Sequence, residues 1–249
     1  MLGRDLSRAL DPVLFARDVG LEPDGWQGEV LAGGHRRMLL NCARQTGKST
    51  TTAALAAWTA LYQPPALVLI VSPAERQSGE TFRKAMAFYR ALGAGAPELE
   101  LESVLRAQWR NGSRLIALPG SGDTIRSYSA VDLLILDEAS RIPDTLLAAV
   151  RPMLAVSRGR LVALSTPAGR RGFFFEAWEH GQDWHKVKFT AENCPRITAE
   201  FLEHERREIG ELLYRQEYLC EFVDDGESVF MSKIIEAALS DDVAPLFAV

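Results

Sequence analysis

The chain has 249 residues, of which 47% are hydrophobic and 24% are charged, with a formal net charge of −5. This length can bury a substantial core, as one large α/β domain or a main domain with a small appendage, and the composition excludes a largely disordered protein. The acidic balance argues against a surface that binds nucleic acid over its whole area, although local arginine clusters remain compatible with such binding. These clusters are Arg36-Arg37, Arg106/Arg110/Arg114, Arg158/Arg160 and Arg170-Arg171.

The cysteines and the apolar runs favour a cytoplasmic protein. Cys42, Cys194 and Cys220 lie far apart and match no metal-ligand or disulfide spacing, which fits a reducing compartment. No apolar run approaches the roughly 20 residues that span a bilayer. Charged residues also interrupt the first 21 positions, where a signal peptide would carry its apolar core.

The first half of the chain predicts strands that alternate with helices. Residues 38–42 and 66–71 are short apolar runs typical of buried strands. Between them, residues 48–62 predict an alanine-rich helix that Pro64-Pro65 ends. A second helical stretch runs to about residue 92, so the pattern already favours an α/β fold.

The next segment changes to alternating polarity. Residues 99–118 surround the turn dipeptide Asn111-Gly112 and predict two antiparallel strands. Further strands are expected at 131–136 and 161–165, with a helix at 144–156 between them and an edge strand at 184–189. We therefore expect a mainly parallel sheet with right-handed crossovers, flanked by helices.

After residue 193 the composition becomes that of charged helix. Four residues, Phe201, Leu202, Ile209 and Leu213, have the spacing to face a small core. We expect a small helical subdomain over residues 194–230, packed on the main α/β unit of residues 1–193. The remaining residues, 231–249, are too few for another domain, with a possible helix at 233–239.

A phosphate-binding loop is the first chemical motif. The stretch CARQTGKST at residues 42–50 matches G-x-x-x-x-G-K-[ST] at Gly47, Lys48 and Ser49 but has Cys42 in place of the first glycine. In such loops backbone N–H groups and the helix N-terminus surround the β-phosphate, the lysine bridges the β- and γ-phosphates, and the serine ligates Mg²⁺. The expected nucleotide-binding residues are Arg44, Gln45, Thr46, Gly47, Lys48, Ser49 and Thr50.

An acidic strand end is the second motif, and it decides between a real site and a chance match. The run LLILDE ends in Asp137 and Glu138. Mg²⁺ in a nucleotide site needs a carboxylate from a neighbouring strand, which suits Asp137, and Glu138 suits the polarisation of the attacking water. Because both motifs end strands in the right order, they predict an ATP site at the carboxyl edge of the sheet.

Other polar residues would assist this site. Ser165-Thr166-Pro167 ends another strand, and a hydroxyl there could contact the γ-phosphate or its water, although an ordinary turn is the alternative. Arg44 and Arg141 are candidate catalytic arginines, since a guanidinium on the developing charge accelerates phosphoryl transfer roughly 10³- to 10⁵-fold. A surface salt bridge is the alternative for Arg141. Gln27 could read an adenine edge, whereas the adjacent Trp26 is expected in the core.

This set of residues resembles the ATPase domain of the large terminase subunit, the motor that packages DNA in tailed bacteriophages. The resemblance spans nearly the whole chain, and a variant loop without the first glycine is characteristic of that family. Its motifs are WQ at 26–27, CARQTGKS at 42–49, LLILDEA at 133–139, STP at 165–167, and YRQEYLCEF at 214–222 followed by DDGESVF.

The resemblance implies a P-loop NTPase fold of the RecA-like, additional-strand type, with ATP and Mg²⁺ as cofactors. Residues 1–193 would be the ATPase core, 194–230 a helical lid, and 231–249 the start of a linker to a nuclease domain whose activity is not expected in this chain. Glu138, Arg44 and Arg141 would be catalytic, Arg141 across a ring of subunits. Ser49 and Asp137 would hold the metal, Gln27 would read adenine, and Ser165, Thr166 and Pro167 would form the coupling motif.

The resemblance also implies partners and a location. These are double-stranded DNA of a viral genome, the portal protein, the small terminase subunit and further copies of the chain. The copies would form a ring when assembled, whereas the isolated chain would be a monomer. The site would be the cytoplasm of the infected bacterial host, with transient docking on the procapsid portal.

Two other readings remain open. A helicase or RecA-like remodeller shares the loop, the acidic strand and the glutamine, but a second RecA-like half does not fit in 249 residues. A nucleotide-switched assembly module with little turnover would bind ATP without needing a positioned base, and Glu138 argues against it.

Overall fold

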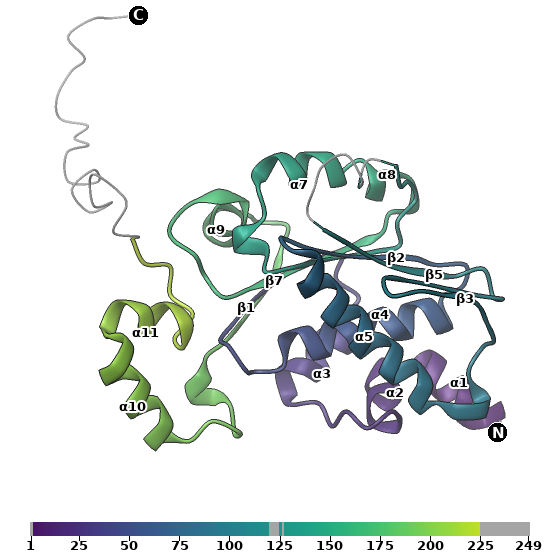
Figure 1. Ribbon diagram of the computed structural model, residues 1–249, viewed down its shortest axis with the longest axis horizontal. Coiled ribbons are helices and arrows are strands. Elements are labelled where there is room, and N and C mark those ends of the chain that lie inside the picture. The colour runs from purple at the N-terminus through teal and green to yellow at the C-terminus, as the bar shows by residue number, and fades with distance from the viewer. Residues whose placement is uncertain (1, 120–124, 126, 225–249) are drawn as a thin grey trace, which may run out of the picture.

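One mixed sheet organises the computed structural model, which describes residues 2–119, 125 and 127–224 (Figure 1). Within these residues the sheet has eight strands in the order β3-β4-β5-β2-β6-β7-β1-β8. The strands are β1 (Arg37–Cys42), β2 (Leu67–Ser72), β3 (Leu99–Glu102), β4 (Arg106–Trp109), β5 (Arg114–Pro119), β6 (Leu133–Asp137), β7 (Arg160–Ser165) and β8 (His185–Phe189).

Helices cover both faces of this sheet, and each face has its own apolar core (Figure 1). One face carries α1 (Leu2–Leu10), α2 (Pro12–Asp18), α3 (Gly25–Ala32), α4 (Lys48–Tyr62) and α5 (Glu75–Ala91). The other carries α7 (Asp144–Val150), α8 (Met153–Ser157) and α9 (Gly172–Glu179). Helices α10 (Ala199–Ile209) and α11 (Glu211–Glu217) lie to one side, and short 3₁₀ turns occur at Gly93–Gly95, Ala139–Arg141 and Ala191–Asn193.

The parallel part of the sheet places the chemical motifs at one edge. From β5 through β2, β6, β7 and β1 to β8, neighbouring strands pair in parallel. In β1, β2, β6 and β7 nearly all residues are buried, on both faces of the sheet, which explains the continuous apolar runs in the sequence. Parallel strands end together, so Cys42, Asp137 and Ser165 share the carboxyl edge. The predicted fold class and the edge strand β8 are confirmed.

The antiparallel part is larger than predicted. The turn at Asn111-Gly112, where Gly112 has φ 87°, joins β4 to β5 as expected. A second turn, closed by the bond from Ser103 N to Arg106 O (2.8 Å), separates β3 from β4. Residues 99–118 therefore contribute three antiparallel strands and not two.

The predicted helix at 144–156 is also divided. Helix α7 ends at Val150 and α8 begins at Met153, with Pro152 between them. Proline has no amide hydrogen to continue the ladder of helix hydrogen bonds, and its ring hinders the preceding turn. The prediction of one continuous helix was wrong because it gave Pro152 too little weight.

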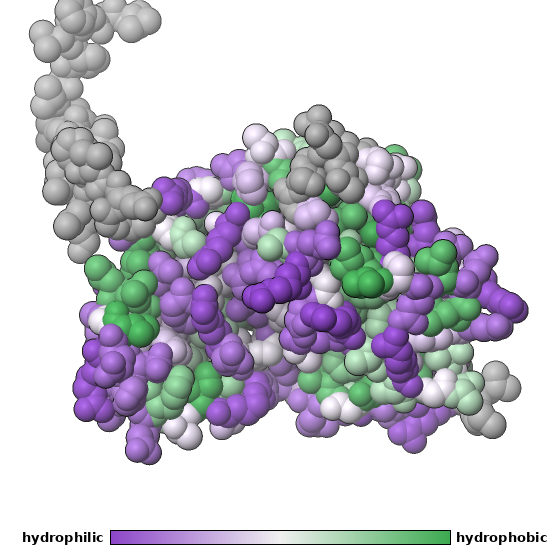
Figure 2. Space-filling view, viewed as in Figure 1, coloured by the Kyte–Doolittle hydropathy of each residue, from purple (hydrophilic) through white to green (hydrophobic). Residues whose placement is uncertain are grey.

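The helices α10 and α11 pack around a small core of their own, which Leu202 and Tyr214 enter with Ala43 of the phosphate loop. Phe201 and Leu213, which were expected in this core, are 47% and 52% exposed. Gly210 (φ 78°) breaks the helix, so the helical period of α10 does not continue into α11. A hydrophobic patch lies over this part of the molecule at the left of Figure 2. The end of the predicted lid (225–230), the linker (231–249) and the helix expected at 233–239 lie outside the described residues.

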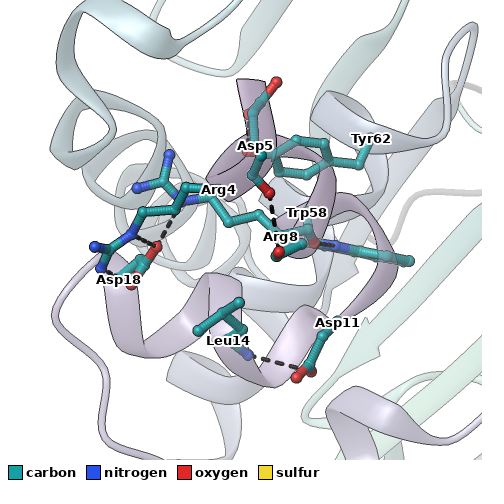
Figure 3. Close-up of polar contacts among 10 residues, drawn as sticks. Arg4, Asp5, Arg8, Asp11, Leu14, Asp18, Trp58 and Tyr62 are labelled. Atoms are coloured by element: carbon teal, nitrogen blue, oxygen red, sulfur yellow. Dashed lines mark hydrogen bonds and ion pairs between the residues drawn. The ribbon is translucent and has the colours of Figure 1, made fainter. Parts of the chain in front are cut away.

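The N-terminal helices are tied to α4 by polar contacts that the sequence did not predict (Figure 3). Trp58 Nε1 donates to the carbonyl of Arg8 at 2.8 Å, and the Tyr62 hydroxyl donates to Asp5 Oδ1 at 2.9 Å. Burial, together with this bond to Asp5, raises the pKa of Tyr62 to about 12. Helix α1 is thereby fixed on the outer side of α4.

Asp18 is the centre of the same network. Its carboxylate accepts hydrogen bonds from the guanidinium groups of Arg4 (2.6 Å) and Arg8 (2.7 Å) while its own side chain is almost fully buried (Figure 3). The bonds from Arg4 and Arg8 hold the pKa of this carboxyl well below its usual range. The network therefore contributes to stability wherever Asp18 is ionised.

Candidate nucleotide site

The phosphate loop needs no glycine at its first position. Cys42 is the last residue of β1 and pairs in register with Phe189 of β8, in ordinary extended backbone. The left-handed conformation occurs later in the loop, at Gln45 (φ 61°) and Gly47 (φ 91°). Glycine is therefore required by geometry at Gly47 and not at residue 42.

Cys42 instead serves as a small apolar residue. Its side chain is fully buried, and burial raises the pKa of the thiol, to which the neighbouring Cys220 adds. A neutral thiol behaves as a compact hydrophobe in a core. The departure from the glycine pattern thus fills space at the sheet edge.

Several side chains fix the loop around Thr46. The Thr46 hydroxyl donates to the carbonyl of Ala43 at 2.7 Å across the loop. Its carbonyl in turn accepts from Gln27 Nε2 (3.4 Å) and from Arg196 Nη2 (3.3 Å). A Cβ at Gly47 would lie 2.6 Å from Gln27 Nε2, so Gln27 packs directly against the loop. These contacts hold the loop from the α3 side and from the segment before α10.

Gln27 is buried, and the protein itself uses both ends of its amide. Its Oε1 accepts from Asp24 N at 2.8 Å, which caps α3, while Nε2 contacts Thr46. Trp26 is buried against Phe189, as expected for a core residue. The sequence did not predict that Gln27 holds the loop, and its role as the adenine reader stays a prediction.

Lys48 is positioned to meet an anion. It is the first residue of α4, it is only 7% exposed, and its amine has no hydrogen bond or ion pair with any described residue. The stem of this side chain is therefore buried, and an unpaired ammonium group at the protein surface is available to an anion. The N-terminus of α4 adds partial positive charge at the same place.

Asp137 brings the second motif to the first. It is 4% exposed, and its Oδ1 lies 3.4 Å from the Ser49 hydroxyl at the start of α4. Its Oδ2 accepts from the Thr81 hydroxyl of α5 at 2.8 Å, which fixes the carboxylate. The sequence missed Thr81, which is one of several polar residues on an amphipathic helix and has no motif around it.

A hydroxyl and a carboxylate oxygen are the donor types that Mg²⁺ takes in nucleotide sites, where phosphate oxygens and water complete the shell. Ser49 and Asp137 supply such a pair at the mouth of the loop. No cluster of three or more His, Cys, Asp or Glu side chains suited to a metal occurs in the part of the chain that the structure describes. The Ser49 hydroxyl and the Asp137 carboxylate therefore fit a Mg²⁺ ion that takes its remaining ligands from phosphate oxygens and water.

Glu138 follows β6 in a left-handed conformation (φ 55°, ψ 44°). Its backbone N–H donates to Asp137 Oδ1 at 3.0 Å, so the chain turns sharply around that carboxylate. A non-glycine residue in this region carries about 1–3 kcal/mol of strain, which is typical of functional sites. The two carboxylates therefore occupy different environments despite their adjacency.

Ser140 links the acidic turn to the predicted coupling motif. Its hydroxyl lies 2.6 Å from the Ser165 hydroxyl and donates to the Thr166 carbonyl at 2.8 Å. Ser165, Thr166 and Pro167 are all buried. Sequence reasoning missed Ser140, and its only signal was its place two residues after Glu138.

The two candidate arginines differ in their partners. The Arg44 guanidinium pairs with Glu217 Oε2 of α11 at 2.7 Å and so joins the loop to the C-terminal helices. Arg141 is exposed, and no described residue forms a salt bridge or hydrogen bond with its guanidinium. The alternative of a surface salt bridge for Arg141 thus finds no partner in the described part of the chain.

A cavity of about 530 Å³ opens beside the loop on the side of α10. It is lined by Arg44, Gln45, Arg196, Ile197, Thr198, Phe201 and Tyr218. Arg196 is held there by a bidentate pair with Asp24 (3.0 and 2.7 Å). Aromatic and cationic side chains next to a phosphate loop are suited to the base end of a nucleotide.

Known proteins share this architecture. The chain is 25% identical to the large terminase subunit of Thermus phage G20c and 26% identical to that of Escherichia phage T5, with 87% of this chain matched in each case. The matches cover 52% and 50% of those proteins, so the chain spans about half the length of the curated relatives it matches.

Solved structures are similar in fold. The large terminase ATPase domain of Thermus phage P74-26 gives a TM-score of 0.72 at 23% identity, over 84% of this chain and 97% of that one. The large terminase of another thermophilic bacteriophage, in complex with ADP, gives 0.60 at 11% identity, over 87% and 53%. None of the described helices combines the length and apolar character that a bilayer crossing requires.

A family model described as "Terminase large subunit, T4likevirus-type, N-terminal" matches residues 39–237. This range includes the phosphate loop, the acidic strand, the predicted coupling motif, and helices α10 and α11. The resemblance stated from the motifs is confirmed: the chain belongs to the family of N-terminal domains of the terminase large subunit.

Proposed function

We propose that this chain is the ATP-hydrolysing motor domain of a viral DNA-packaging terminase. One observation carries the proposal: the Ser49 hydroxyl and the Asp137 carboxylate, 88 residues apart in sequence, lie 3.4 Å apart at the start of α4, the helix that Lys48 begins. Family membership and the ADP complex of the thermophilic phage terminase support the same assignment.

Nucleotide binding would use the loop and Lys48. Backbone N–H groups of residues 44–50 and the N-terminus of α4 would surround the β-phosphate, and Lys48 would neutralise the β- and γ-phosphates. Mg²⁺ held by Ser49 and Asp137 would offset the charge that develops on the phosphate oxygens. The hydrogen bond from Thr81 would keep Asp137 in place for that role.

Hydrolysis would use Glu138 as the base. Glu138 follows Asp137 directly, and its left-handed backbone turns the chain at this point. From there its carboxylate would accept a proton from the attacking water. Arg141, exposed and unpaired among the described residues, would reach the site of a neighbouring subunit in a ring. Arg44 would act within its own subunit after leaving Glu217.

Coupling would pass through contacts that touch both the site and the C-terminal helices. Ser140 joins the turn after Glu138 to Ser165 and Thr166, so a change at the γ-phosphate would reach β7. Arg44 and Glu217 connect the loop to α11. We propose that residues 194–230 act as a lid that these contacts shift against the ATPase core of residues 1–193.

The base of ATP would enter the cavity beside α10, with Phe201 and Tyr218 as apolar walls. Exposure of Phe201 is then explained by a ligand and not by poor packing. Gln27 is buried behind the loop and is not among the residues that line this cavity, so reading the adenine would require it to move from its contact with Thr46.

The proposed partners are the double-stranded viral genome, the portal protein, the small terminase subunit and further copies of the same chain in a ring. Motors of this kind hold phosphates and not bases, so DNA binding should be salt-sensitive and tolerant of sequence. The proposed location is the cytoplasm of the infected host.

The central test is Glu138→Gln, measured as ATP turnover and ATP affinity in parallel. Loss of a catalytic base should lower turnover about 10²- to 10⁴-fold while the affinity for ATP stays within a small factor. Glu22→Gln, at an exposed position on the N-terminal side, is the matched control and should leave both unchanged. Unchanged turnover in Glu138→Gln would refute the assignment of the base.

The other readings predict different outcomes in the same material. A nucleotide-switched assembly module would bind ATP without turnover at any protein concentration, with or without DNA. A helicase would separate the strands of a short duplex, which a packaging motor should leave paired.

A further inference from the structure

A second cavity lies at the opposite edge of the sheet from the nucleotide site. It measures about 490 Å³ and opens where β1 and β7 begin. Since β1 has six residues and a strand rises about 3.3 Å per residue, the cavity is about 20 Å from the phosphate loop. It is therefore separate from the ATP site.

Four arginines line this cavity, and no acidic residue of the described chain does. They are Arg36, Arg37, Arg151 and Arg158, with Leu154 and Leu161 among the remaining lining residues. Acidic residues outnumber basic ones in the chain, 33 to 28, so the exclusion of carboxylates here does not follow from composition. Only Arg37 has an ion pair within the described residues, to the exposed Asp183 at 3.9 Å, a distance at which the gain is small.

The other three guanidinium groups have no hydrogen bond or ion pair within the described ranges. Arg36, Arg151 and Arg158 come from three different chain segments: the start of β1, the turn between α7 and α8, and the turn after α8. Like charges gathered in this way repel one another in the free protein. An anion in the cavity would remove that repulsion.

The turn that carries Arg158 is held rigidly. Arg158 is left-handed (φ 54°), and a Cβ at the next residue, Gly159, would come within 1.9 Å of the Val131 carbonyl. The Ser157 hydroxyl donates to the same Val131 carbonyl at 2.5 Å. The turn is thus anchored to the strand region before β6, and the arginine is presented from a fixed backbone.

The facing segment is held as well. The Arg160 guanidinium donates to the carbonyl of Gly33 at 2.7 Å and to that of His35, which ties the residues before β1 to the start of β7. Leu161 N donates to the Arg36 carbonyl at 2.8 Å. Arg36 and Arg158 are therefore brought together by backbone contacts independent of any ligand.

We propose that this arginine-lined cavity binds backbone phosphates of duplex DNA. Guanidinium groups match phosphate geometry with paired N–H donors and are the preferred side chains for nucleic-acid phosphates. All four arginines are exposed, so they can follow an extended polyanion, whereas a site for one small anion would be closed and lined by backbone N–H groups. The choice of DNA rests on the proposed packaging function.

The test compares two double variants in duplex DNA binding by fluorescence anisotropy over a series of salt concentrations. Arg36→Ala with Arg151→Ala removes two charges from the cavity at positions without backbone strain. Arg17→Ala with Arg207→Ala removes two exposed charges elsewhere and is the matched control. ATP turnover without DNA is recorded for each, since none of these residues belongs to the nucleotide site.

The cavity variant should lose at least about 10-fold in DNA affinity at low salt, and the slope of log K against log salt should become shallower by about 2. The control should change affinity less than about 2-fold. Equal affinity in the two double variants, or no DNA binding by the wild-type chain at low salt, would overturn the proposal. Inorganic phosphate that displaces DNA more strongly than chloride at matched ionic strength would show a small-anion site and would also overturn it.

This outcome is separable from the proposed function. If the two double variants bind DNA equally while the wild type still turns over ATP, only the assignment of the cavity is removed. Loss of the proposed function would instead be seen as absent turnover in the wild-type chain.

Discussion

Charged side chains have different partners in two regions of the molecule. The first is the carboxyl edge of the sheet with the phosphate loop, called here the nucleotide edge, and the second is the pair of N-terminal helices α1 and α2. At the nucleotide edge, Lys48 is buried without a partner in the described chain, and Glu138 is held in a left-handed conformation. In the N-terminal region, the buried carboxylate of Asp18 is shared by two arginines, and Trp58 has its indole N–H satisfied. The nucleotide edge leaves a cation for a ligand, while the network around Asp18 pairs its charged groups internally.

This difference separates residues that act on a ligand from residues that stabilise the fold. Substitutions of the charged side chains at the nucleotide edge should lower activity and leave stability unchanged or higher, because an unpaired charge or strain is removed. Ser140 differs, since its removal breaks supporting hydrogen bonds. Substitutions in the N-terminal network should lower stability and leave the chemistry intact. Four variants test the contrast.

The largest effect is expected for Arg141→Ala at high protein concentration. If Arg141 completes a neighbour's site, turnover per subunit should rise with concentration in the wild type and stay flat in the variant. At protein concentrations at which the subunits assemble, turnover per subunit should differ between the wild type and the variant by about 10³-fold, the lower end of the range for a catalytic arginine. Concentration-dependent ATPase assays check this, and a flat profile in both proteins would remove the role across subunits.

Lys48→Ala should follow, with hydrolysis lower by about 10²- to 10³-fold, the loss typical of one removed electrostatic contact to a developing charge. Alanine is also the best helix former for the first residue of α4, and the variant removes an ammonium group that has no partner among the described residues. We therefore expect a melting temperature equal to or above that of the wild type. Lys186→Ala, at an exposed position, is the control, and a lower melting temperature in Lys48→Ala alone would contradict the contrast.

Asp18→Asn should have the opposite profile. Loss of the charged hydrogen bonds from Arg4 and Arg8 should lower the free energy of unfolding by about 1–3 kcal/mol at neutral pH, with ATP turnover per folded molecule unchanged. Asp183→Asn, at an exposed position, is the matched control. Chemical denaturation followed by tryptophan fluorescence gives the measurement.

The pH dependence sharpens the same prediction. The folded pKa of Asp18 is lowered, so its contribution is complete above the unfolded pKa near 4 and is lost as the pH falls toward the folded value. Asp18→Asn should therefore differ most from the wild type at neutral pH and converge with it in acid. A difference that stays constant down to low pH would show that the effect of the substitution is steric.

The sequence predicted most of the parallel sheet because the central strands β1, β2, β6 and β7 are short apolar runs that must be buried on both faces. It also brought Lys48, Ser49 and Asp137 to one place, since the chemistry requires the first two at the start of the helix after a phosphate loop and the third at a strand end. What it could not predict are contacts set by tertiary packing. Thr81 and Arg196 touch the site from segments without any motif.

Local breaks explain the wrong elements. Pro152 divides the helix expected at 144–156, and Gly210 ends the period that would have buried Leu213. Pro152 and Gly210 can both be seen in the sequence, but the prediction followed the hydrophobic periodicity across them. The extra strand β3 depended on a turn at Ser103 that contains neither glycine nor proline.

The smallest effect is expected for Ser140→Ala, which tests whether the nucleotide edge is a set of independent ligands or a connected unit. Removal of the hydroxyl leaves Ser165 Oγ and the Thr166 carbonyl without their bonds to the acidic turn, at a cost of about 1 kcal/mol. Because Ser140 is not itself a predicted nucleotide contact and acts through Ser165 and Thr166, kcat should fall about 5-fold while KM stays constant. Steady-state kinetics measure the split, with Ser7→Ala as a control on the exposed surface of α1. A rise in KM at constant kcat would place Ser140 in nucleotide binding, and an unchanged kcat would mean that the turn after Glu138 acts without help from β7.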